Sequence, residues 1–171
     1  MKAVSRVRCV LMREHRYLLA QHNSRRLDKA GKWGLPGGGL KKPEGPKAGL
    51  RRELAEELRL RVPYLVEVGD WRHRGHTHRV FGCEIATPVE WFEAAELLGI
   101  GWFSYEEVRA MAQGGQLHRD FELEAIGVFN RRIRLLDNSV DRGSRKRFRC
   151  GGGTGLEGGV TYGSPSRAPS Q

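Results

Sequence analysis

The sequence contains few cysteines and no long apolar run, which argues against a disulfide-rich protein and against a membrane-spanning one. Its three cysteines, Cys9, Cys83 and Cys150, are odd in number and far apart, which argues against a disulfide framework or a CxxC metal site. No apolar stretch approaches the roughly 18–20 residues that span a bilayer, so we expect no membrane partner. The N-terminus carries scattered charges and lacks an A-x-A-like cleavage site, unlike a signal peptide. We therefore expect a cytoplasmic protein.

Acidic residues are outnumbered, with 20 Asp and Glu against 30 Lys and Arg, and the formal net charge is +10. A basic protein favours a polyanionic partner, either a nucleotide or a nucleic acid, because positive potential raises the rate of encounter with phosphates. The 39% of hydrophobic residues suffices for one ordinary core. We expect one domain over residues 1–138. The basic Gly/Ser/Arg-rich tail, residues 139–171, is expected to be disordered because it cannot bury enough apolar surface.

Hydrophobic periodicity predicts the order of strands and helices along the domain. Strands are expected at residues 3–12, 16–22, 64–72, 77–86 and 100–103, with a short strand from Trp33 that ends in the glycine turn 37–39. Helices are expected at residues 46–60 and 120–136, with a helical turn after Ser104, which is a typical N-cap residue.

Three glutamates fall on one side of the predicted helix 46–60. At 100° per residue, Glu53, Glu56 and Glu57 lie within an arc of about 100°, beside a stripe of leucines. Like charges at these spacings repel each other, so a cation is expected to offset them. Carboxylates suit Mg²⁺, with Mn²⁺ as the alternative. Charge spacing alone also fits a solvated helix face in which Arg52 and Glu56 form an ordinary ion pair.

The string from Gly38 to Leu60 resembles the Nudix box, G-x5-E-x7-R-E-U-x-E-E-x-G-U, in which U is aliphatic. Eight of the nine specified positions match, namely Gly38, Glu44, Arg52, Glu53, Leu54, Glu56, Glu57 and Leu60. Arg59 stands where the pattern has a glycine that ends the helix in a left-handed conformation, which arginine adopts reluctantly. We therefore expect altered geometry at this helix end, with Pro63 able to stop the helix a turn later.

The resemblance implies an α/β Nudix fold, a mixed β-sheet sandwiched between α-helices, over about residues 3–137. It also implies Mg²⁺-dependent hydrolysis of a pyrophosphate bond in a nucleoside diphosphate linked to another moiety, such as a (d)NTP or a nucleotide sugar. One alternative is removal of pyrophosphate from the 5′ end of RNA, which the basic tail favours. A second is a non-catalytic nucleotide- or RNA-binding regulator on the same fold, from which the box glutamates would be expected to be lost.

Roles for the box residues follow from the same resemblance. Glu53, Glu56 and Glu57 would hold the metal, helped by the backbone of Gly37 or Gly38. Glu44 would be a further ligand or would fix the loop against Arg52, whose planar fork would orient the glutamates. The general base would be Glu53 or a later glutamate, for which Glu93 and Glu96 are the candidates.

Substrate contacts are expected from residues outside the box. Arg25 and Arg26 are candidates to clamp a terminal phosphate and Trp33 to stack a base, although solvated loop arginines and a core tryptophan are the common alternatives. The histidines at positions 73, 76 and 78 are expected at a solvated hairpin tip, with phosphate or metal binding less favoured. The expected partner is a small nucleotide; nucleic acid is less favoured, and a homodimer is left open.

Overall fold

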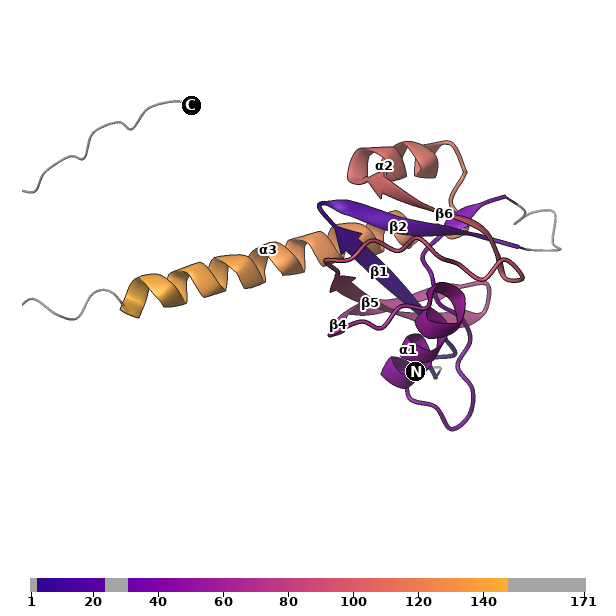
Figure 1. Cartoon of the computed structure of the whole chain (residues 1–171), viewed down its shortest axis with the longest axis horizontal. Coiled ribbons are helices and arrows are strands. Elements are labelled where there is room, and N and C mark those ends of the chain that lie inside the picture. Colours follow the sequence, from indigo (N-terminus) through magenta and orange to yellow (C-terminus); the bar gives the residue numbers. More distant parts are fainter. Residues whose placement is uncertain (1–2, 24–30, 148–171) are drawn as a thin grey trace, which may run out of the picture. The chain divides into compact units, whose positions relative to one another are not determined.

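The computed structural model describes residues 3–23 and 31–147 of the chain, with side chains up to Leu136. The strands are β1 (Arg6–Arg13), β2 (Arg16–His22), β3 (Trp33–Gly34), β4 (Val66–His73), β5 (His76–Glu84) and β6 (Leu97–Ser104). The helices are α1 (Pro46–Leu58), α2 (Tyr105–Gln113) and α3 (Glu122–Arg147) (Figure 1). Every strand and helix predicted from periodicity is present, and the boundaries differ by a few residues except at the C-terminal end of α3.

The strands form one mixed sheet in the order β3-β2-β1-β5-β4, with β6 on the other edge of β2. Strands β1 and β5 run parallel from the pair Arg6 and His78 to the pair Met12 and Glu84. The remaining strand pairs are antiparallel. Such a sheet, with local hairpins and one long-range parallel pair, confirms the predicted sheet type.

Strands β1 and β2 separate soon after the turn that joins them. They pair only at Met12 with Tyr17 and at Arg13 with Arg16. The first half of β1 is hydrogen-bonded instead to residues 36–40. Two of these bonds run from Cys9 N to Pro36 O at 3.0 Å and from Val7 N to Gly38 O at 2.9 Å. The glycine turn is therefore held as an additional strand-like edge of the sheet.

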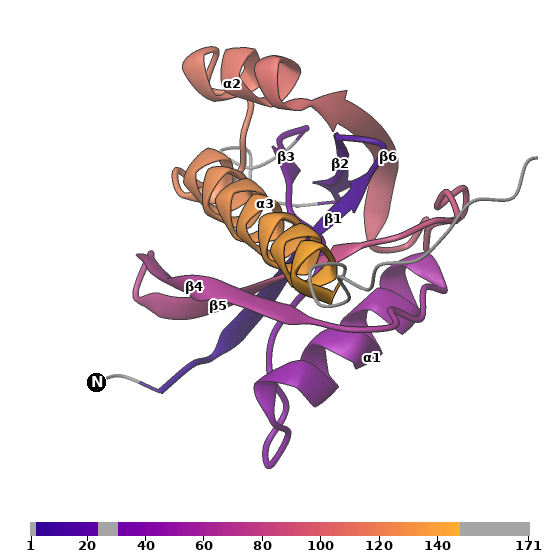
Figure 2. The ribbon, with the colours of Figure 1, turned by 90° about the vertical axis from the view of Figure 1, so that its left-hand side faces the viewer.

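Helices cover both faces of the sheet, and each face has its own apolar core. On one side, Leu50, Leu54 and Leu58 of α1 pack in a cluster with Val7, Cys9, Leu11 and Phe81. On the other side, Val108 of α2 and Ile126 and Phe129 of α3 pack in a cluster with Val10, Met12 and Val80. Figure 2 shows α1 and the start of α3 on opposite sides of β4 and β5. The expected sandwich of a mixed sheet between helices is confirmed.

The end of α1 differs from the expectation for an arginine in the glycine position of the box. Arg59 adopts the left-handed conformation itself, with φ 49° and ψ 29°, and the helix ends at Leu58. Two backbone bonds close the end, from Arg59 N to Ala55 O and from Leu60 N to Leu54 O, each 3.1 Å. The Arg59 guanidinium also lies 3.8 Å from the centre of the Trp91 ring. The predicted alteration is wrong because these contacts offset the strain of a left-handed arginine.

Helix α3 is longer than the periodicity predicted. It continues to Arg147, past the predicted end at Leu136, and so enters the segment that was assigned to the tail. Arginine and lysine are good helix formers, and an existing helix propagates through them without an apolar stripe. The rest of the predicted tail, residues 148–171, lies outside the described residues. Within the described chain, no helix combines the length and apolar character that crossing a membrane requires.

Candidate active site

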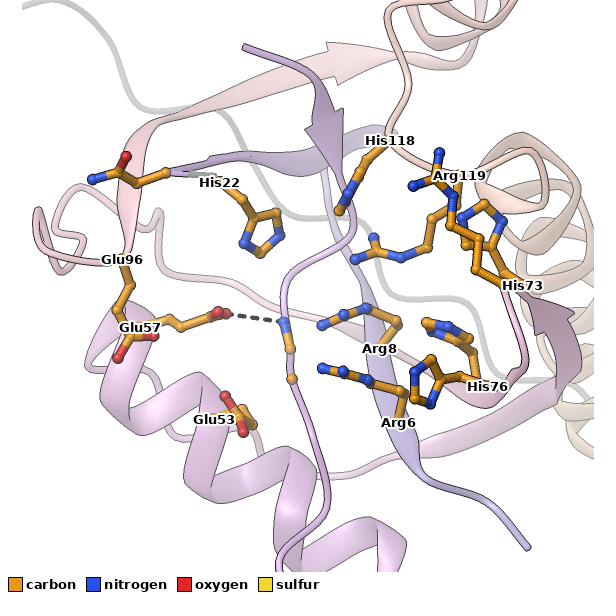
Figure 3. A pocket seen from close by; sticks show the side chains of 15 residues that line it. Arg6, Arg8, His22, Glu53, Glu57, His73, His76, Glu96, His118 and Arg119 are labelled. Atoms are coloured by element: carbon orange, nitrogen blue, oxygen red, sulfur yellow. Dashed lines mark hydrogen bonds between the residues drawn. The ribbon is translucent and has the colours of Figure 1, made fainter. Parts of the chain in front are cut away.

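A cavity of about 450 Å³ opens where β1 and β2 separate, and Glu53 and Glu57 of the Nudix-like string line it. In Figure 3 the carboxylates of Glu53, Glu57 and Glu96 gather on one side of this pocket. Arg6 and Arg8 lie on the opposite side, and Gly37 and Gly38 also line the pocket. The pocket thus has an acidic side and a basic side.

Arg52 organises the acidic side through a complete set of hydrogen bonds. Its Nε and Nη2 donate to the two carboxylate oxygens of Glu44 at 2.9 and 3.0 Å, and Nη2 also donates to Gly39 O at 3.0 Å. Its Nη1 donates to Glu53 at 3.0 Å and to Glu56 at 2.8 Å. All five guanidinium donors are therefore used within the protein. The bond from Arg52 lowers the pKa of Glu44 to about 2.

Glu57 is buried against the glycine turn. Its carboxylate accepts a 2.9 Å hydrogen bond from Gly37 N, and its side chain is 3% exposed. Burial raises the pKa of Glu57 to about 7, against the opposing effects of the Gly37 bond and of Arg8. Gly37 has a φ of 119°, and a Cβ there would lie 2.5 Å from Val7 O. Only glycine at this position lets the turn approach β1 and hold the carboxylate at the same time.

Gly38 makes room for the second carboxylate. A Cβ at Gly38 would lie 2.3 Å from the carboxyl carbon of Glu53, so the glutamate occupies the space that a side chain would need. The Gly38 carbonyl accepts the hydrogen bond from Val7 N that fixes the turn to β1. The turn cannot move away from Glu53 without breaking this bond.

The structure separates the predicted acidic residues into two groups. Glu53 and Glu57 line the pocket, whereas Glu56 is not among its described lining residues and bonds Arg52 instead. Of the two loop candidates for the base, Glu96 lines the pocket and Glu93 does not. The backbone N of Glu93 donates to Glu57 O at 2.8 Å, which ties this loop to α1. Among the described residues, no three His, Cys, Asp or Glu side chains are arranged as a ready metal-binding group.

The basic side of the pocket was not predicted. Arg6 and Arg8 alternate along β1 and therefore point to the same face of the sheet. The guanidinium of Arg8 belongs to a residue only 4% exposed, and its Nε and Nη1 have no hydrogen-bond partner among the described residues. Burial lowers the pKa of Arg8 to about 9, and Arg119 adds to this effect. In the sequence, only the R-x-R spacing of Arg6 and Arg8 within a predicted strand indicated that two arginines share one face of the sheet.

Three histidines also line the basic side. His73, His76 and His78 all line the pocket. His76 is exposed at the tip of the β4–β5 hairpin, as predicted, and His73 is half-buried opposite it, whereas His78 is buried and the prediction is wrong for this residue. His78 is 3% exposed because it pairs with Arg6 in the sheet and packs beside Phe121 at 5.2 Å between ring centres. Burial, with a contribution from Arg8, lowers the pKa of His78 to about 3. The ring is therefore neutral at pH 7.

Arg119 completes the basic side and joins it to α3. Its Nη1 donates to Glu122 at 2.7 Å, and both side chains are buried. Glu122 also accepts bonds from the backbone N of Leu35 at 3.1 Å and of Arg119 at 3.2 Å. This buried pair fixes the start of α3 to the segment that leads into the glycine turn. No local sequence pattern identified it.

The remaining substrate-binding predictions have different outcomes. Trp33 packs edge-on against Phe103, 5.1 Å between ring centres, and is not among the described residues that line the pocket. Its position fits the core alternative because the ring packs against the apolar cluster that contains Val10, Leu19 and Leu35. Arg25 and Arg26 lie outside the described residues.

Comparisons with known proteins agree with this geometry. A family model described as the NUDIX domain matches residues 2–123. A MutT-like protein from Streptomyces ambofaciens is 37% identical over 101 residues, which cover 58% of this chain and 62% of that relative. The chain therefore aligns with less than two thirds of the relative's length.

Solved structures share the fold. The NUDIX domain of Shewanella oneidensis NrtR, in complex with ADP-ribose, has a TM-score of 0.64 at 21% identity, covering 78% of this chain and 90% of that one. A C. elegans Ap4A hydrolase in a binary complex has a TM-score of 0.62 at 14% identity, covering 75% and 98%. The family model spans more than half of the sequence, and the sheet, the helices and the glycine turn have the arrangement implied by the box. The chain belongs to the Nudix hydrolase family.

Proposed function

We propose that the chain is a Mg²⁺-dependent pyrophosphohydrolase that cleaves a nucleoside diphosphate linked to another moiety. The observation that supports this proposal is that the carboxylates of Glu53 and Glu57 both lie at the glycine turn. Beside them, all the hydrogen-bond donors of Arg52 are used within the protein, one of them by Glu53. Two carboxylates at one pocket wall repel each other, and a divalent cation would relieve that repulsion. A purely structural ion-pair network would not need glycine at both positions of the turn.

The donor set fits a hard divalent cation. Glu53 and Glu57 would supply carboxylate oxygens from the pocket wall, and Glu56 would add a third from the same helix edge. Manganese has the same ligand preference and is the expected substitute for magnesium. When bound, such a cation neutralises charge on a diphosphate and lowers the pKa of water.

The protein's own residues would position the reacting groups. Arg52 holds the Glu53 carboxylate at 3.0 Å and leaves no donor for substrate, so it is a positioning residue. Gly37 N holds Glu57 in the same way from the other side. Glu96, from the loop before β6, lines the same pocket and is the candidate to take a proton from the attacking water. Glu53 is the alternative base.

The related structures support a nucleotide substrate. The Shewanella domain was solved with ADP-ribose, which is a nucleoside diphosphate joined to a sugar. The C. elegans protein is named as a hydrolase of Ap4A, in which phosphoanhydride bonds join two nucleosides. The cavity of about 450 Å³ suits one nucleotide-sized ligand. A non-catalytic regulator is less consistent with this chain, because the glutamates and their positioning contacts are all retained.

A nucleotide panel with Mg²⁺ tests the proposal. Purified full-length protein is incubated with nucleoside triphosphates, ADP-ribose, nucleotide sugars and dinucleoside polyphosphates, and the products are identified by chromatography and ³¹P NMR. We expect release of a nucleoside monophosphate or pyrophosphate from at least one class. Glu57→Gln should abolish turnover, whereas Glu90→Gln, an exposed glutamate outside the pocket, should not. Absence of any product across the panel, with folded protein and metal present, contradicts the proposal.

A further inference from the structure

We propose that the basic side of the pocket binds a phosphate group of the substrate that is separate from the diphosphate cleaved beside the glutamates. This basic wall consists of Arg6, Arg8, His73, His76, His78 and Arg119. The inference rests on the proposed function and names a substrate class. The preferred substrate carries an additional phosphomonoester or a longer phosphate chain.

Arg8 is the main support for this inference. Arg52 uses all five of its donors within the protein, and Arg119 is paired with Glu122. Arg8 is equally buried, yet its Nε and Nη1 have no acceptor among the described residues. Buried charged donors are nearly always satisfied, because leaving them unpaired is costly. A buried guanidinium that borders a cavity and is incompletely hydrogen-bonded within the protein is complementary to an anionic group such as a phosphate.

The sheet gathers further positive charge around Arg8. The parallel register of β1 and β5 places Arg6 beside His78, and Arg119 arrives from the segment before α3. Within the described part of the chain, no carboxylate lies within ion-pair distance of Arg6 or Arg8. The charges of Glu57 and Glu122 offset that of Arg8 only from beyond ion-pair distance, and Arg119 and Arg6 oppose it, so the wall favours an anionic ligand over a neutral base or sugar.

The position of the wall separates its ligand from the scissile diphosphate. In Figure 3 Arg6 and Arg8 lie across the pocket from Glu53 and Glu57. A metal-bound diphosphate would lie beside the glutamates. A phosphate held by Arg8 is then another group of the same ligand. The wall would therefore favour nucleotides that carry a phosphate group in addition to the diphosphate that is cleaved.

Binding without metal isolates the wall from the acidic side. In EDTA the glutamates repel anions, so uptake of inorganic phosphate reports on the wall alone. Calorimetry of the full chain should show phosphate binding that weakens roughly tenfold or more in Arg8→Gln, as expected for the loss of a charge-assisted hydrogen bond. Arg72→Gln is the matched control, because Arg72 is exposed and outside the described pocket lining, and its affinity should stay within about twofold of wild type.

Two further variants keep the test decisive. Arg8→Lys retains the charge and loses the fork, so phosphate binding should fall between wild type and Arg8→Gln. Arg6→Gln changes a half-buried residue and serves if Arg8→Gln does not fold. Equal phosphate affinity in wild type, Arg8→Lys and Arg6→Gln overturns the inference.

Turnover in Mg²⁺ then tests the substrate class. Matched pairs differ by one phosphate: ADP-ribose and its 2′-phosphate, dephospho-coenzyme A and coenzyme A, and nucleoside diphosphate and triphosphate. Wild type should prefer the more phosphorylated member of at least one pair by roughly tenfold in kcat/KM, and Arg8→Gln should bring that ratio near one.

The two proposals fail in distinguishable ways. If the protein binds phosphate in EDTA but turns over no nucleotide, the proposed pyrophosphohydrolase activity is contradicted, while phosphate binding by the basic wall is supported. If kcat/KM is equal within every substrate pair and no phosphate binds in EDTA, the proposed phosphate-binding role of the basic wall is overturned, while the pyrophosphohydrolase activity is supported.

Discussion

The backbone N–H of Gly37 and the carboxylate of Glu57 are joined by a 2.9 Å hydrogen bond between residues twenty positions apart. This bond connects the glycine turn to α1 at the point where the sheet opens. It holds a buried carboxylate whose pKa is raised to about 7 by desolvation. The bond therefore fixes where the acidic side of the pocket meets the backbone.

Replacing Gly38 with alanine should reduce activity more than stability. The new Cβ would meet the Glu53 carboxylate, while the bond from Val7 N to Gly38 O keeps the turn in place. Glu53 must therefore move, and a displacement of about 1 Å at a catalytic group can cost roughly 100-fold in kcat/KM. Steady-state kinetics and thermal unfolding are measured together. Gly45→Ala is the control, since a Cβ there meets nothing within 4 Å, and equal activity losses in both variants would contradict the argument.

Replacing Arg52 with lysine should lower kcat with a smaller effect on KM. Lysine retains the charge but cannot donate to Glu44, Glu53, Glu56 and the Gly39 carbonyl together. The glutamates then lose their fixed orientation, and we expect kcat to fall by roughly tenfold or more. Arg51→Lys on the exposed face of the same helix is the matched control and should behave like wild type. A variant at Arg52 that changes only KM would instead indicate direct substrate contact.

In mild acid His78 contributes a loss of stability, which opposes the gain from Glu57, whose folded pKa of about 7 lies above its usual value. Its folded pKa of about 3 lies below the usual 6.5, owing to burial and to the nearby charges of Arg8, Arg119, His73 and Arg6. The unfolded chain takes up the proton first, so the stability contributed by the neutral ring is complete above pH 6.5 and is lost as the pH falls toward 3. At pH 5 the loss is about 2 kcal/mol.

Urea unfolding between pH 5 and pH 7.5 measures this loss. His78→Gln should remove this loss, because an amide does not titrate, so its unfolding free energy at pH 5 relative to pH 7.5 should be about 2 kcal/mol higher than in the wild type. His15→Asn, in the exposed turn between β1 and β2, is the control and should keep the wild-type slope. Identical slopes in wild type and His78→Gln would assign the acid sensitivity to other groups.

The left-handed end of α1 predicts an energetic coupling between Arg59 and Trp91. Arg59→Gly relieves backbone strain of about 1 kcal/mol and removes a cation–π contact worth roughly 0.5–1 kcal/mol. The single substitution should therefore change stability little. Trp91→Leu should destabilise the wild type more than it destabilises the Arg59→Gly variant, by about 0.5–1 kcal/mol. A double-mutant cycle in urea measures the difference, and purely additive effects would show that the ring does not support the helix end.

The sequence allowed the acidic side of the site to be predicted because its spacing is local. Glu53 and Glu57 share one helix, and the glycine turn precedes that helix by a few residues. The strands were likewise predictable from short-range alternation. The Trp91 contact that lets Arg59 end the helix could not be predicted, since it comes from a loop with no periodic pattern.

The basic side depends on pairings that no local pattern contains. Arg6 meets His78 only because β1 and β5 pair in parallel over a long separation in sequence. Arg119 joins them through its bond to Glu122 at the start of α3. The alternation of Arg6 and Arg8 indicates a shared face, but not that this face borders a cavity. Which side of a strand meets solvent is decided by the elements that pack on it.

The hydrogen bonds from Val7 and Cys9 to the carbonyls of Gly38 and Pro36 have a mechanical consequence for the pocket. One wall of the cavity is built from the same ladder that stabilises the sheet, so bending that wall would require breaking main-chain bonds of the core. Amide protons of Val7 and Cys9 should accordingly exchange with solvent as slowly as those in the middle of β5.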